Sequence, residues 1–150
     1  MSNTQAIVAA AILSVASAAT AADGLIAVKS SHNAKDTMNR LEDVVKQRNL
    51  LVFARIDHAG GALKVGKTLR PTEVLIFGNP QSGTLLMECA QSAGIDLPLK
   101  ALVWEDASAL VWLDYNDPGY LITRHGVAQC PAVVNVRKTL AAIAETVTAR

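Results

Sequence analysis

The sequence has almost no net charge and no run of one sign. Its 150 residues carry 14 Lys and Arg against 13 Asp and Glu, and at most two like charges are adjacent. Nucleic-acid surfaces and polybasic membrane patches both need basic side chains gathered on one face. The composition therefore argues against a nucleic-acid partner and against electrostatic attachment to a membrane.

Histidine and cysteine are also scarce, which limits metal and redox chemistry. His32, His58 and His125 are scattered, and Cys89 and Cys130 do not give them the ligand spacing of a zinc, haem or copper site. We therefore expect neither a metal nor a cofactor. One formula misleads: residues 61–68 fit the phosphate-binding loop G-x4-G-K-[ST], but a proline and a strand follow at once, so the helix that holds the phosphates has no room.

Only one long uncharged segment is present, residues 6–22, and it consists mostly of Ala, Ile, Val and Leu. It is shorter and richer in Ala than a membrane span of ~20 strongly apolar residues. Residues 19–21 have the small-x-small pattern of a signal-peptidase site, although residues 1–5 lack the usual Lys or Arg. Retention of this segment as an anchor is the alternative.

These features predict a secretory signal peptide over residues 1–22, cleaved after Ala21 or Ala22. The remaining residues, 23–150, are long enough for one domain with its own core. We expect the protein to be exported, to the periplasm or beyond. Export would place Cys89 and Cys130 in an oxidising compartment where they can pair. The alternative, that Cys89 is an ordinary core residue on a helix face, stays open because the sequence gives no Cα separation.

Strand-like and helix-like segments alternate along this part of the chain, which predicts an α+β domain. Strands are predicted over residues 24–30, 50–57, 72–77, 97–105 and 109–115, the last two as a hairpin. Helices are predicted over residues 33–48, 84–93, 117–125 and 131–148, with residues 58–70 as a connection. Leu102 and Trp104 oppose Ala101 and Val103 on one strand, so the sheet is apolar on both faces. Few helices are available to cover it, and we expect self-association.

The polar residues at one strand exit suggest chemistry. Asp57 could orient His58 as a general base, with Glu105 as a distant partner, which would suit a small hydrolase or isomerase. Arg55 and Asp57 forming an ordinary strand-end ion pair is the favoured alternative. No Gly-x-Ser-x-Gly nucleophile motif is present, and His125 is interpreted as a helix-terminal residue favoured by the helix dipole.

The turn over residues 78–84 places a strand end and a helix N-terminus together, which favours a small anionic or carboxylate ligand. Thr84 is expected to cap this helix. Ordinary strand-to-helix punctuation is the alternative. The candidates for ligand binding are Arg55, His58, Asn79, Gly83 and Thr84.

Several runs of residues resemble the bacterial domain-of-unknown-function family 302. They are residues 52–59, 75–80 with 83–84, 96–99, 103–106, and 115–118 with 120–121. The resemblance extends from Leu25 to Gly126 and implies a two-layer domain with a β-α-β(4)-α core, here with an extra short helix and a C-terminal amphipathic helix, often assembled as a homodimer. The family implies no activity and no catalytic residue. We therefore expect a non-catalytic, homodimeric ligand-binding or interaction module.

Overall fold

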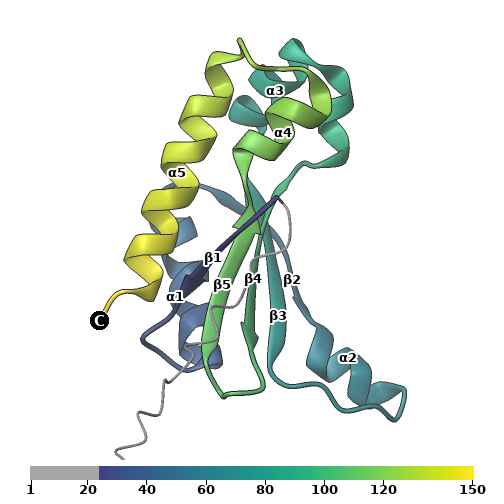
Figure 1. The fold of residues 1–150 in the computed structure, drawn as a ribbon, viewed down its shortest axis with the longest axis vertical. Coiled ribbons are helices and arrows are strands. Elements are labelled where there is room, and N and C mark those ends of the chain that lie inside the picture. Colours follow the sequence, from purple (N-terminus) through teal and green to yellow (C-terminus); the bar gives the residue numbers. More distant parts are fainter. Residues whose placement is uncertain (1–23) are drawn as a thin grey trace, which may run out of the picture.

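The computed structural model describes residues 24–150 and shows one five-stranded antiparallel sheet with helices packed on one face (Figure 1). The elements are β1 (Leu25–Lys29), α1 (Ala34–Gln47), β2 (Leu51–Asp57), α2 (His58–Lys64), β3 (Thr72–Gly78), α3 (Pro80–Cys89), η1 (Gln91–Ile95, a 3₁₀ helix), β4 (Leu99–Glu105), β5 (Val111–Asn116), α4 (Pro118–His125) and α5 (Pro131–Thr148). The strand order is β1-β5-β4-β3-β2. The predicted two-layer α+β class is confirmed, whereas the predicted signal peptide lies outside the described residues.

The main core lies between the sheet and the helices α1 and α5. The Asn33 side chain caps α1 by accepting the Asp36 N–H at 2.8 Å, and the helix then presents Met38, Leu41 and Val45, all fully buried. Alternate strand residues such as Leu75 and Phe77 meet them from the sheet. This packing fixes the sheet that carries the site.

A second, smaller core lies at one end of the sheet, where α3, η1, α4 and the start of α5 gather (Figure 1). Leu86, Leu121 and Val133 are buried there beside Cys130. In the structure Cys130 is joined to Cys89 by a disulfide bond, with the two Cα atoms 5.9 Å apart. The bond ties the end of α3 to the start of α5.

The opposite face of the sheet carries no helix among residues 24–150 (Figure 1). Val74, Ile76, Leu102, Trp104 and Trp112 are on this open face, and each remains partly exposed. The predicted second apolar face is therefore present in the described structure. No helix within this range is both long and apolar enough to cross a membrane.

Three local predictions were wrong. The residues predicted as a connection contain α2, because the Asp57 carboxylate accepts the Gly60 N–H at 2.7 Å and caps a helix there. That helix projects from the sheet with no buried residue (Figure 1). Lys67 and Thr68 follow its end, so they do not open a helix, as the exclusion of a phosphate-binding loop requires.

The second error concerns the start of α3. Asn79, not Thr84, is the N-cap, because its side-chain oxygen accepts the Gln81 N–H at 2.8 Å and Pro80 occupies the first helical position. The Thr84 hydroxyl instead donates to the Pro80 carbonyl, one turn back. The N-cap therefore lies five residues earlier than predicted.

The third error concerns β2, where a bulge between Val52 and Ala54 interrupts the alternation of side chains. Val52 pairs with Phe77 on the helix-covered face, whereas Ala54 pairs with Ile76 on the open face. Regular alternation along the predicted strand 50–57 would place Val52 and Ala54 on one face, and the bulge separates them. The bulge leaves Phe53 about half exposed at the sheet edge.

Candidate functional site

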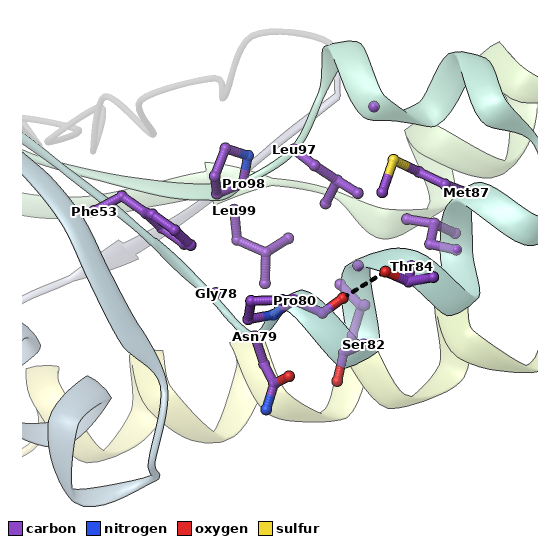
Figure 2. Close-up of a pocket in the computed structure, with 14 residues that line it drawn as sticks. Phe53, Gly78, Asn79, Pro80, Ser82, Thr84, Met87, Leu97, Pro98 and Leu99 are labelled. Carbon is purple, nitrogen blue, oxygen red and sulfur yellow. Dashed lines mark hydrogen bonds between the residues drawn. The ribbon is translucent and has the colours of Figure 1, made fainter.

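A cavity of about 340 Å³ lies where the start of β2 and the end of β3 meet α3 and the segment leading into β4. Its walls are mainly apolar. Figure 2 shows Phe53 on one side and Met87 on the other, with Leu97, Pro98 and Leu99 between them. Small-molecule sites have this character, a concave apolar space with a few polar groups placed at its edge.

Two glycines keep this space open. A side chain on Gly83 would place its Cβ 3.6 Å from the Leu97 side chain, and one on Gly78 would meet Pro98 at 3.8 Å. Both distances are ordinary van der Waals contacts, so larger side chains at these positions would occupy the cavity. The cavity thus depends on the small residues of the turn that the sequence analysis singled out.

Asn79, Ser82 and Thr84 supply the polar side chains of the lining (Figure 2). Asn79 and Thr84 are engaged in the helix start described above, while the Ser82 hydroxyl makes no hydrogen bond to the described protein atoms. Pro80 has no N–H, and the Gln81 N–H is taken by Asn79. Among residues 24–150, no charged side chain lines the cavity, so this lining is apolar rather than cationic.

Of the five predicted ligand-binding residues, Asn79, Gly83 and Thr84 line the cavity and Arg55 and His58 do not. Arg55 is engaged elsewhere. Its guanidinium donates to both oxygens of Glu73, at 2.6 and 3.2 Å, and to Glu42 at 3.2 Å. The Glu73 hydrogen bond is the main cause of the raised pKa of Arg55, while hydrogen bonds from Lys46 and then Arg55 lower the pKa of Glu42. Arg55 thus fastens β2 to α1 and β3.

The predicted catalytic candidates are not brought together. Asp57 caps α2, and His58 is an exposed residue at the start of that helix. Glu105 is at the end of β4, where its backbone N–H bonds to the Pro71 carbonyl. No hydrogen bond joins any two of these three side chains in the described structure, so the hydrolase or isomerase built on them lacks its geometry.

A different polar cluster, which the sequence analysis missed, joins η1 to α4. His125 Nε2 is 2.6 Å from the Asp96 carboxylate, and His125 Nδ1 is 3.0 Å from the Ser92 hydroxyl. Arg124 donates to the other Asp96 oxygen at 2.9 Å. The histidine side chain is only 4% exposed, whereas Ser92 is exposed. His125 therefore ends α4, as predicted, and its buried ring is in addition hydrogen-bonded through both nitrogens.

No spacing signal could have revealed this cluster. Ser92 and Asp96 precede the β4–β5 hairpin, and His125 follows it, 33 and 29 residues later. Among residues 24–150, no three His, Cys, Asp or Glu side chains gather as a metal ion would require. The cluster is therefore a hydrogen-bonded chain that ends at an exposed hydroxyl.

One buried carboxylate lies on the open face of the sheet. Asp114 accepts a hydrogen bond from Trp104 Nε1 at 2.8 Å through Oδ2, while Oδ1 is buried and has no hydrogen-bond partner within the part of the chain that the structure describes. Burial raises the pKa of Asp114 above its ordinary value. The open face thus holds an unsatisfied hydrogen-bond acceptor among apolar side chains.

Curated relatives share part of this chain. Proteins named "Fluoride-specific ion channel FluC 1" from Brucella suis biovar 1 (strain 1330) and Brucella abortus biovar 1 (strain 9-941) are each 47% identical over 104 residues. The match takes in 69% of this chain but 41% and 38% of those proteins. The chain therefore spans about two fifths of the length of these relatives.

A solved structure and a family model cover more of the chain. The crystal structure of an uncharacterized conserved protein DUF302 from Bacillus stearothermophilus superposes with a TM-score of 0.74 at 22% identity, over 83% of this chain and 98% of that one. That likeness supports the fold alone. The family model described as "Domain of unknown function DUF302" matches residues 26–147. The chain belongs to the DUF302 family of domains of unknown function.

Proposed function

We propose that this protein is an exported, homodimeric module that binds a small ligand in the cavity beside α3. The observation that supports this proposal is the apolar cavity of about 340 Å³, kept open by Gly78 and Gly83. Its apolar walls suit a ligand with an apolar body, and the unengaged Ser82 hydroxyl on its edge suits a polar head such as a hydroxyl or carboxylate. A purely anionic ligand finds less support, because the described lining of the cavity includes no cation.

Filling the cavity tests this proposal. Hexanoate and hexanol serve as probes in ¹H–¹⁵N NMR titrations, since they share an apolar chain and differ in the head group. We expect shifts concentrated at the amides of Gly78, Gly83 and Gly94, and their loss in a Gly83→Leu variant. Gly61→Leu is the matched control, because a Cβ at Gly61 meets nothing within 4 Å. Equal shifts in wild type and Gly83→Leu would refute binding in this cavity.

The homodimer rests on the open face of the sheet. Two partly exposed tryptophans, Trp104 and Trp112, lie there among aliphatic residues. An apolar sheet face of this kind is usually covered by a further layer of structure or by another protein chain. A second copy would bring an equally apolar face against these residues, and two-fold pairing of one patch with itself is the commonest form of assembly, which favours self-association over an unrelated partner.

Sedimentation equilibrium at micromolar concentration tests the dimer. Trp112→Glu should give a folded monomer, because a charge would be placed within the apolar interface. Val134→Glu is the control, since Val134 is an exposed apolar residue on α5, on the other side of the molecule. A wild-type protein that stays monomeric, or a Trp112→Glu dimer of unchanged affinity, would contradict this assignment.

The relatives supply a second candidate function, an association with fluoride channels. The observation is the 47% identity over 104 residues to proteins that bear the name of a fluoride-specific ion channel. A domain that recurs in such proteins would be expected to act beside the channel. Deleting the gene should then lower the fluoride tolerance of its host. Unchanged tolerance, together with no shift or broadening of the ¹⁹F NMR signal of fluoride when the purified protein is added, would remove this candidate.

A further inference from the structure

We propose that Ser92, His125 and Asp96 form a nucleophilic site that cleaves small esters with an apolar acyl group. This activity goes beyond ligand binding: the choice of substrate rests on the cavity of the proposed function, whereas the nucleophile at Ser92 does not. The first observation is the order of the hydrogen bonds, Ser92 hydroxyl to His125 Nδ1 at 3.0 Å and His125 Nε2 to Asp96 at 2.6 Å. A nucleophile, a base and a carboxylate that orients the base have this relation in serine hydrolases on unrelated folds.

The tautomer of His125 follows from its partners. A carboxylate can only accept a hydrogen bond, and Arg124 donates to the other Asp96 oxygen, so His125 Nε2 must carry a proton toward Asp96. Nδ1 of the neutral ring is then a lone-pair acceptor facing the Ser92 hydroxyl. This arrangement uses the two ring nitrogens in the reverse of their more common roles, but it performs the same task.

Exposure also fits the assignment. The imidazole is 4% exposed and is shielded from water, whereas Ser92 is open to solvent and can be reached by a substrate. Gly94 and Leu97 belong to the same segment as Ser92 and Asp96, and both line the apolar cavity. An acyl chain held in that cavity would lie next to the segment that carries the nucleophile. The substrate class is therefore an ester with a short aliphatic acyl chain.

The reaction balances with water as the second substrate. Ser92 Oγ attacks the ester carbonyl carbon and its proton passes to His125 Nδ1. The bond from that carbon to the alkoxy oxygen breaks, and the alcohol leaves with the proton from His125. Water then attacks the acyl carbon and gives a proton to Nδ1, the bond to Oγ breaks, and Ser92 regains its proton as the carboxylic acid departs. Arg124 donates to Asp96 and so helps to hold the carboxylate that orients His125.

Covalent labelling tests the assignment directly. The mature protein, treated with an alkyl fluorophosphonate, should gain one adduct by intact mass, and peptide mapping should place it on Ser92. Hydrolysis of p-nitrophenyl hexanoate should fall at least tenfold in Ser92→Ala and Asp96→Asn. The loss in Ser92→Ala should occur without a change in melting temperature, because Ser92 is exposed.

Ser108→Ala is the matched control, an exposed serine in the β4–β5 turn that lies outside the cluster. It should keep wild-type labelling and rate. Ser92→Cys should retain a measurable reaction with the ester, since a thiol can take the place of the hydroxyl. An adduct on another residue, or equal hydrolysis by wild type and Ser92→Ala, would overturn the proposal and leave the cluster as a structural link between η1 and α4.

Discussion

The disulfide between Cys89 and Cys130 gives the sharpest stability prediction. It joins the end of α3 to the residue before α5, across a sequence separation of 41 residues. In the chain-entropy model, closing a loop of that length removes about 4 kcal/mol of unfolded-state conformational freedom. A domain is commonly stable by roughly 5–15 kcal/mol, so this is a large share of the total. The small second core around Cys130 depends on it most.

Reduction should therefore lower the melting temperature strongly. At about 3–5 °C per kcal/mol for a domain of this size, the loss is roughly 10–20 °C. Circular dichroism melts with and without a phosphine reductant measure it. The double variant Cys89→Ala, Cys130→Ala should melt near the reduced wild type and should not respond to the reductant.

Thiol titration supplies the independent check. The denatured, unreduced protein from an oxidising compartment should show no free thiol, and two after reduction. Two free thiols before reduction, or melting temperatures within 2 °C of each other in the two redox states, would refute the reasoning. Both cysteines would then be packing residues only.

Three further predictions concern the core, the open face and the leader. Leu41→Ala should cost about 2–5 kcal/mol in urea unfolding, because Leu41 is fully buried between α1 and the sheet, whereas Leu63→Ala on exposed α2 should change the stability by less than ~0.5 kcal/mol. Burial raises the pKa of Asp114, so the stability it contributes is fully present below its ordinary pKa of about 3.9 and is lost as pH rises through the raised value. Asp114→Asn should remove that loss, and its advantage over wild type in urea unfolding should grow from pH 4 to pH 7; parallel curves would contradict the assignment. The intact mass of the exported protein should correspond to a chain that begins at Ala22 or Asp23. A mature species that keeps Met1 would contradict export.

Periodicity made most of the fold predictable. α1, α5 and the β4–β5 hairpin carry long apolar patterns that agree with their caps and turns. Their predicted and observed bounds therefore agree within a few residues. The errors arose where one side chain decides the outcome. Single hydrogen bonds cap α2 at Asp57 and α3 at Asn79, and one extra residue makes the bulge after Val52. Such local features leave no periodic signal in the sequence.

The candidate site was predictable only in part, because its walls come from separate segments. The turn with Asn79, Gly83 and Thr84 was identified from its strand-to-helix character. Phe53 reaches the cavity from the edge strand, and Leu97 reaches it from the other side of η1. Neither approach follows from the local sequence. The apolar nature of the cavity, which disfavours a purely anionic ligand, is likewise a product of tertiary packing.

The cavity and the Ser92 cluster share one mechanical support, the second core. Leu86 lines the cavity and also packs in that core beside Cys130, and His125 ends α4, which packs against α5. Reduction of the disulfide should therefore weaken both functions together, before the sheet unfolds. We expect hexanoate binding and ester hydrolysis at 25 °C to fall in parallel in the Cys89→Ala, Cys130→Ala variant.

Arg55→Lys provides the comparison for that experiment. It replaces the two-pronged contact with Glu73 at the far end of β2, so it should lower stability without touching the second core. Ligand binding and hydrolysis should stay at wild-type levels in this variant at 25 °C. If the cysteine variant kept both activities, or if Arg55→Lys lost them equally, the two sites would not depend on the disulfide-linked core, and the coupling argued from their shared residues would be wrong.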